Sequence, residues 1–65
     1  MKRRDLLQHL NEHGCVLKRE GGSHSVFFNP VTRAVTSVPR HTEIKSPTAR
    51  KICRDLEIPV PANVA

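Results

Sequence analysis

The segment from Ser46 to Leu56 places the strongest structural constraint on this chain. A serine followed by Pro47 is typical of a helix start, because serine can cap the first free amides and proline has a φ already suited to a helix. We therefore expect Ser46 to be the N-cap and Pro47 the first helical residue. Behind them, apolar side chains recur at i, i+3, i+4 and i+7, at Ala49, Ile52, Cys53 and Leu56. Such a helix has one apolar stripe, and the rest of the chain must supply a surface that covers it.

The preceding residues predict a second helix and three short strands. In residues 4–13, three leucines lie at helical spacing, and Gly14 is typical of the position just past a helix end. Short segments rich in alternating or β-branched residues follow, at 15–20, 23–29 and 33–38. Gly21-Gly22 is a turn signal between the first two, since consecutive glycines can adopt backbone angles closed to other residues.

The order helix, three strands, helix predicts an α+β fold. A three-stranded antiparallel sheet can bury one face under two helices and leave the other to solvent, which gives a two-layer α-β-β-β-α sandwich. This element order resembles that of the double-stranded-RNA-binding domain. The length of 65 residues suits one small domain, residues 1–65, with a thin core. Pro59 and Pro61 end the last helical pattern, so residues 59–65 are expected to form a loose tail.

The charge balance favours a polyanionic partner. Eleven Lys and Arg residues against six Asp and Glu residues give a net charge of +5, a bias typical of nucleic-acid-binding domains. The alternative is a solvated positive surface without an anionic partner. The sequence has no recognisable secretory signal or membrane-spanning segment, and its two cysteines do not make a disulfide framework. We therefore expect a cytoplasmic protein with no membrane partner, in which Cys15 and Cys53 are small buried thiols.

His24 is the leading candidate for a catalytic residue. It follows Gly21-Gly22-Ser23 and begins the second predicted strand. Histidine can accept and donate a proton near neutral pH, and glycine amides can approach a phosphate closely. RNA cleavage needs no metal when a base removes the proton of the 2′-hydroxyl, which then attacks the adjacent phosphate. The alternative is a histidine that caps the turn or packs at the strand start.

Strand parity leaves open which face of the sheet carries His24. It shares a face with Val26 and Phe28, whereas Ser25 and Phe27 share the other. Because the two phenylalanines are adjacent, either face could be the buried one.

Other polar residues are weaker candidates. Arg40, His41 and Lys45 lie in one loop and could clamp a phosphate, although the alternative is an ordinary polar loop. His9 and His13 lie four positions apart on the first predicted helix, but nothing supplies a third metal ligand at a suitable spacing. We therefore expect neither a metal site nor a cofactor.

Four segments of the chain occur in a recognisable series: DLLQHLNEHG, REGGSHSVF, VTSVPRHTEIK and ARKICRDLEI. They resemble the HicA-type toxins, the small messenger-RNA interferases of bacterial toxin–antitoxin pairs, over about residues 4–58. The resemblance implies the double-stranded-RNA-binding type of fold, cleavage of messenger RNA, growth arrest and neutralisation by a HicB antitoxin. It also implies that His24 of the Gly-Ser-His unit is catalytic, with Gly22 and Ser23 shaping the approach to it.

From these observations we expect a toxin that is a metal-independent endoribonuclease, with His24 as general base or acid. Arg40 and His41 occupy a Pro-Arg-His segment that recurs in the family, and with Lys45 they are second-rank candidates for phosphate or RNA binding. One alternative is a non-catalytic RNA-binding module of the same fold, and another is a protein-interaction subunit. The chain has two aromatic residues, so base stacking has few platforms.

Overall fold

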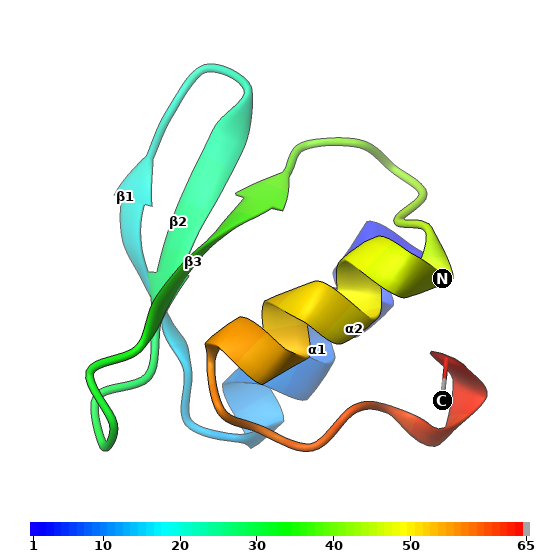
Figure 1. The fold of residues 1–65 in the computed structure, drawn as a ribbon. Coiled ribbons are helices and arrows are strands. Elements are labelled where there is room, and N and C mark those ends of the chain that lie inside the picture. Colours follow the sequence, from blue (N-terminus) through cyan, green and yellow to red (C-terminus); the bar gives the residue numbers. More distant parts are fainter. Residues whose placement is uncertain (65) are drawn as a thin grey trace.

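The elements follow the predicted order of helix, three strands and helix, which confirms the α+β fold class (Figure 1). The computed structural model describes residues 1–64. Its elements are α1 (Arg3–Glu12), β1 (Val16–Glu20), β2 (His24–Phe28), β3 (Val35–Pro39), α2 (Ser46–Asp55) and a 3-10 turn, η1 (Ala62–Val64). No helix among these residues is long and apolar enough to cross a membrane.

The three strands form one antiparallel sheet in the order β1-β2-β3. The β2–β3 register starts with His24 opposite Pro39 and continues without interruption along both strands. The β1–β2 pairing is irregular, because β1 has one extra residue between Leu17 and Arg19. Both helices lie on one side of the sheet, and the β1–β2 hairpin extends beyond them at one end (Figure 1). The other side of the sheet is open, as the two-layer prediction requires.

His24 lies on the open face of the sheet. Along β2, Ser25 and Phe27 are buried, whereas His24 is exposed and Val26 and Phe28 are partly exposed. Phe27 belongs to the hydrophobic core, which also contains Leu6, Leu10, Cys15, Val38, Ile44, Ala49, Ile52, Cys53, Leu56 and Val64. The question that the adjacent phenylalanines left open is thereby answered, and the imidazole faces away from the helices.

The helix ends follow the sequence signals, with one shift. α1 ends just before Gly14, whose φ of 82° is left-handed and suits glycine. Ser46 is the first residue of α2, and Lys45 takes the N-cap position without a side-chain hydrogen bond. The prediction that Ser46 is the N-cap was therefore wrong. Pro47 is the second residue of α2, where its missing N–H costs nothing, because the first N–H groups of a helix have no acceptor within it.

The N-terminal residues pair with the segment that follows β3. The Arg3 N–H donates to the Thr42 carbonyl oxygen at 2.8 Å, and the Ile44 N–H donates to the Met1 carbonyl oxygen at 2.8 Å. The N-terminal amine also lies 2.9 Å from a carboxylate oxygen of Glu43. This short antiparallel bridge places the basic start of the chain beside the end of β3.

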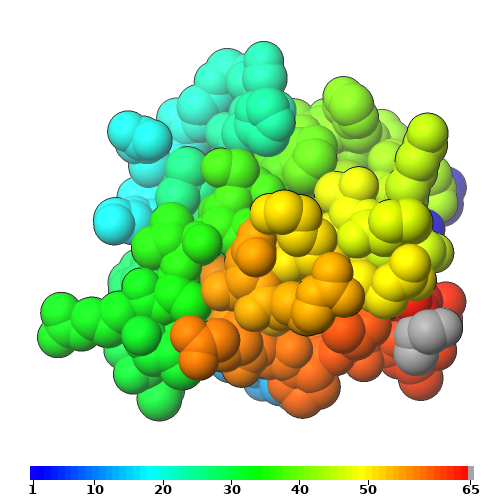
Figure 2. Space-filling view, viewed as in Figure 1, coloured from blue at the N-terminus to red at the C-terminus, as the bar shows by residue number. Residues whose placement is uncertain are grey.

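The C-terminal residues lie against the body of the molecule as far as residue 64 (Figure 2). Pro61 and Val64 are buried, and Val64 contributes to the core. The Arg50 side chain on α2 donates from Nη1 to the Val64 carbonyl oxygen at 3.0 Å. In residues 59–64, the described part of the tail that was expected to be loose, Val64 therefore joins the core and Val60 packs against it, whereas residue 65 lies outside the described residues.

Candidate active site

The β1–β2 turn holds Gly21 and His24 in close contact. The Gly21 N–H donates to the His24 carbonyl oxygen at 2.8 Å, with Gly22 and Ser23 between them. A Cβ on Gly21 would lie 2.9 Å from that same oxygen, whereas a Cβ on Gly22 would meet nothing within 4 Å. Neither glycine has a left-handed φ. The turn therefore requires glycine at position 21 for close approach, and the expected special backbone angles are not used.

Strand pairing brings a cation and a hydroxyl to the face that carries His24. Arg19 and Ser37 stand on either side of Val26, on β1 and β3, while Pro39 stands opposite His24. Side chains directly opposite each other in a sheet share a face. A hollow of about 480 Å³ lies there, lined by Arg19, Glu20, Gly21, Gly22, Ser23, His24, Val26 and Ser37. The histidine thus shares an open hollow with a guanidinium and with the backbone of the turn.

A hydrogen-bonded network supports this region from the helix side. Ser25 is buried, and its hydroxyl donates to the Glu20 carboxylate. The Arg3 guanidinium donates from Nη2 to the Ser25 hydroxyl at 2.8 Å and from Nε to the Pro39 carbonyl oxygen at 2.9 Å. One arginine from α1 therefore joins β2 and β3 at the pair of residues that includes His24.

Arg40 stabilises the β1–β2 turn through hydrogen bonds to its backbone. Its N–H donates to the Ser23 carbonyl oxygen at 3.2 Å, and its Nη1 donates to the Gly21 carbonyl oxygen at 3.1 Å. The same Nη1 lies 3.6 Å from a carboxylate oxygen of Glu20. Of the three loop candidates from the sequence, Arg40 is thus the one that contacts the turn beside His24.

His41 and Lys45 lie in a different place. They line a hollow of about 280 Å³ beside the start of α2, together with Pro39, Glu43, Ile44 and Thr48. The hollow that contains His24 is not lined by either residue. The structure therefore separates the predicted phosphate clamp into two parts, with Arg40 at the turn and His41 and Lys45 beyond it.

The remaining histidines and the cysteines do not add chemistry at this site. The His9 and His13 rings lie 4.5 Å apart, and Nε2 of His9 lies 2.7 Å from the Pro59 carbonyl oxygen. Within residues 1–64 no group of three or more metal-ligating side chains comes together. Cys15 and Cys53 are free and buried. Burial raises the pKa of both thiols, and the charge of Cys15 adds to this at Cys53, so both thiols stay protonated near neutral pH.

Arg19 is the site residue that the sequence reasoning missed. It lies in the REGGSH stretch, and a signal for it was present. With a two-residue turn, Gly21 stands opposite His24, and Arg19, two residues earlier, lies on the same face by strand alternation. None of the ion pairs among the described residues involves Arg19.

Fold and site together define a class: a small basic α-β-β-β-α domain with a histidine exposed beside a hairpin turn. The family model described as HicA toxin of bacterial toxin–antitoxin matches residues 3–58. The chain belongs to the HicA toxin family, as the four sequence segments predicted. Proteins of this family are toxins of toxin–antitoxin systems, generally cleave messenger RNA and pair with HicB antitoxins. No curated protein and no solved structure gives a significant match.

Proposed function

We propose that this toxin is a metal-independent endoribonuclease that cleaves messenger RNA, with His24 as its proton-transfer group. The observation that carries the proposal is the position of His24, exposed on the open sheet face in one hollow with Arg19. Membership of a family of toxins that generally cleave RNA supports the same reading. We place its action in the cytoplasm, where messenger RNA is translated.

The proposed reaction is an internal transfer at phosphorus. The His24 imidazole takes the proton of the 2′-hydroxyl, and the 2′-oxygen forms a bond to the adjacent phosphorus. The bond from phosphorus to the 5′-oxygen of the next nucleotide breaks, and that oxygen receives a proton from water or a second group. The products are a 2′,3′-cyclic phosphate and a free 5′-hydroxyl. The bonds formed and broken and the protons transferred in this reaction balance without a metal ion or a redox partner.

Arg19 and the turn amides supply the positive charge that this reaction requires. The N–H groups of Gly22 and Ser23 donate to no acceptor within the described residues, so they are free to bind phosphate oxygens as the charge develops. A guanidinium can add two parallel hydrogen bonds to the same group. We assign Gly22 and Ser23 to positioning and Arg19 to phosphate binding.

The remaining candidates fit an extended RNA-binding surface. Arg40 acts through the turn that it holds, while His41 and Lys45 lie further along the same end of the sheet and suit phosphates outside the reacting one. Phe28 lies on the face of His24 and is partly exposed. It therefore provides one stacking platform for a base.

A HicB-type antitoxin would neutralise the toxin by covering this open face. The face presents the His24 hollow together with the exposed apolar side chains Val16 and Val35 and the partly exposed Val26. An antitoxin with an acidic and apolar surface matches that combination. Its presence in excess should abolish both cleavage and RNA binding.

The test is an RNA cleavage assay in EDTA with identification of the new ends. We expect cuts that leave a cyclic phosphate and a 5′-hydroxyl, and no cut in a DNA of the same base sequence, because DNA lacks the attacking hydroxyl. Cleavage of the DNA, or a strict requirement for metal, would contradict the mechanism. Tight RNA binding without any cleavage would favour the alternative of a non-catalytic RNA-binding module.

A further inference from the structure

A second hollow, basic in character, lies on the helix side of the sheet. It has a volume of about 440 Å³ and is lined by Lys2, Arg3, Arg4, Arg40 and Thr42. Four of these five residues are cationic, and none carries a carboxylate. The hollow is separate from that of His24, with which it shares no lining residue.

The backbone, rather than flexible side chains, brings the two halves of this basic hollow together. The Arg3 N–H donates to the Thr42 carbonyl oxygen at 2.8 Å, and Lys2 forms a β-bridge with Glu43. The start of the chain is therefore held beside the end of β3, although the two segments lie far apart in the sequence. This fixed arrangement concentrates positive charge at one end of the molecule.

The cations of the basic hollow differ in the hydrogen bonds and ion pairs that they already make. The Arg3 guanidinium already donates to the Pro39 carbonyl oxygen and to the Ser25 hydroxyl. The Arg4 side chain is 83% exposed, and its Nε lies 3.8 Å from Asp5, a weak surface pair. Lys2 is also exposed, and none of the ion pairs within residues 1–64 includes it. Lys2 and Arg4 are therefore available to an anion.

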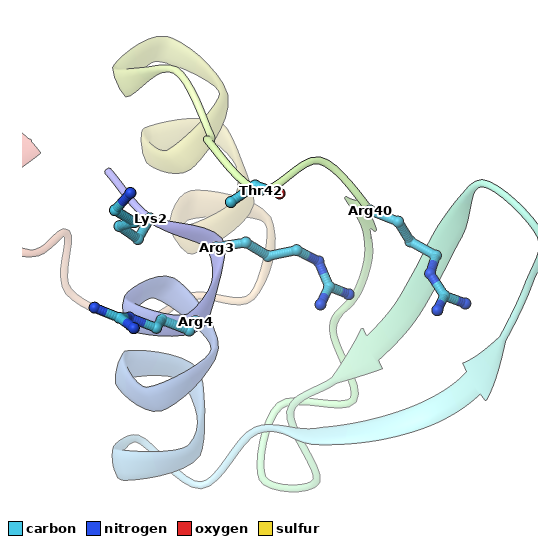
Figure 3. A pocket seen from close by; sticks show the side chains of 5 residues that line it. All are labelled: Lys2, Arg3, Arg4, Arg40 and Thr42. Atoms are coloured by element: carbon cyan, nitrogen blue, oxygen red, sulfur yellow. The ribbon is translucent and has the colours of Figure 1, made fainter.

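The cations stand on two rims, and Arg40 on one of them already donates from Nη1 to the Gly21 carbonyl oxygen. Arg3 extends from the start of α1 toward Arg40, which lies beside the β1–β2 hairpin, whereas Lys2 and Arg4 lie on the other side and point away from Arg40 (Figure 3). A single small anion would need all of its donors to converge on one point. Cations on opposite rims instead suit a ligand with several phosphates in a row.

We propose that the basic hollow binds the backbone of the RNA substrate away from the scissile phosphate, with the strand passing from Arg40 to Lys2 and Arg4. This inference rests on RNA being the substrate, as proposed above. Continuity with the active site favours it, because Arg40 donates to the carbonyl oxygen of Gly21, whose N–H bonds to His24. A strand that leaves His24 across this end of the sheet reaches Arg40 first and the far rim next.

The experiment measures binding of a labelled single-stranded RNA as a function of salt, for the full chain. The RNA carries 2′-O-methyl groups, so that it cannot be cleaved during the measurement. The test variant combines Lys2→Gln with Arg4→Gln. The control combines Lys51→Gln with Arg54→Gln, which removes the same charge from the far part of α2 (Figure 1). Cleavage of a dinucleotide and of a longer RNA is then compared for both variants.

We expect the test variant to bind several-fold more weakly and to reduce the slope of log K against log salt by about 1.4, since two lost contacts count about 0.7 each on a single strand, while the control keeps the wild-type slope. The kcat/KM of the test variant should fall for the longer RNA and stay unchanged for the dinucleotide, because a dinucleotide is too short to extend beyond His24. Equal losses in the two variants, or no change in slope, would overturn the proposal. So would an unchanged RNA slope accompanied by weaker binding of an acidic peptide, which would assign the hollow to a protein partner.

The outcomes also separate this inference from the proposed activity. If the wild type binds RNA but cleaves neither substrate, the catalytic proposal fails while the salt slopes still decide the role of the basic hollow. If the wild type binds no RNA even at low salt, both proposals fail together.

Discussion

The Gly21 N–H lies 2.8 Å from the His24 carbonyl oxygen, and a Cβ on Gly21 would lie 2.9 Å from that same oxygen. Real Cβ atoms essentially never come so close to backbone. The strand that carries the proposed base can therefore close onto β1 only when residue 21 has no side chain. Gly22, whose Cβ would meet open space, is not constrained in this way.

Gly21→Ala should destabilise the protein and reduce cleavage. The new methyl group must push the two strands apart at His24, which we expect to lower the free energy of unfolding by about 1–3 kcal/mol. Gly22→Ala is the matched control and should change it by less than about 0.5 kcal/mol. Urea denaturation of both variants tests this, and equal effects would contradict the role assigned to the close contact.

Arg3→Gln should destabilise the protein, whereas Arg4→Gln should not. Arg3 joins Ser25 and Pro39 across β2 and β3, so its loss leaves buried polar atoms with fewer partners, at a cost of about 1–3 kcal/mol. The neighbouring Arg4 is largely exposed, and its replacement should cost less than about 0.5 kcal/mol. Thermal unfolding of the two variants measures the difference. A stable Arg3→Gln protein would show that the network is dispensable.

Arg19→Gln should lower kcat/KM for RNA by about 10²-fold or more, in the range seen when one donor to a developing charge is removed. Arg19→Lys should recover only part of the activity, because lysine keeps the charge without the fork of hydrogen bonds. Stability should not change, since Arg19 is exposed. Steady-state cleavage kinetics of the two variants provide the measurement, and wild-type activity in Arg19→Gln would remove Arg19 from the site.

Stability should decline at alkaline pH because of the buried thiols. Burial raises the pKa of Cys15 and Cys53 in the folded state, while in the unfolded state they ionise near the ordinary value of 9.0. Below that pH both states keep these protons. Above it the unfolded state loses protons that the folded state retains, so the free energy of unfolding falls as pH rises.

Urea denaturation between neutral and alkaline pH, under reducing conditions, tests this pH dependence. Cys53→Ala should weaken the decline above pH 9.0 by removing one of the two raised groups. The comparison is between the pH slopes of the two proteins rather than their absolute stabilities, because the substitution also changes packing. Identical slopes in both proteins would show that Cys53 does not contribute to the decline in stability.

Much of the fold follows from local patterns. The apolar stripe of α2, the leucines of α1 and the glycine after it each reflect spacing within a few residues, and these elements appear where they were expected. The face of the sheet that carries His24 could not be predicted, because the adjacent Phe27 and Phe28 give each face of β2 one large apolar side chain. The choice depends on which of them packs against the helices, and that is a property of the tertiary structure.

The surroundings of His24 were harder to predict than its position beside the turn. The GGSH stretch singled out the histidine as a candidate, whereas Arg19 could be found only by counting the register back from the two-residue turn. The extra residue between Leu17 and Arg19 gives no local signal and changes the pairing only further along β1. The contacts of Arg3 and the bridge between Lys2 and Glu43 join residues far apart in the sequence. Such pairings arise only when the whole chain has folded, so the basic hollow could not be predicted from the sequence.

The catalytic role of His24 is tested most directly by single-turnover cleavage of RNA in EDTA by the wild type, His24→Ala and His13→Ala. His13 is an exposed histidine at the end of α1 and serves as the control. We expect His24→Ala to lose at least about 10²-fold in rate, as is typical for removal of a general acid or base, with RNA affinity and fold intact, while His13→Ala cleaves like the wild type. Cleavage by His24→Ala at the wild-type rate would contradict the catalytic role of His24.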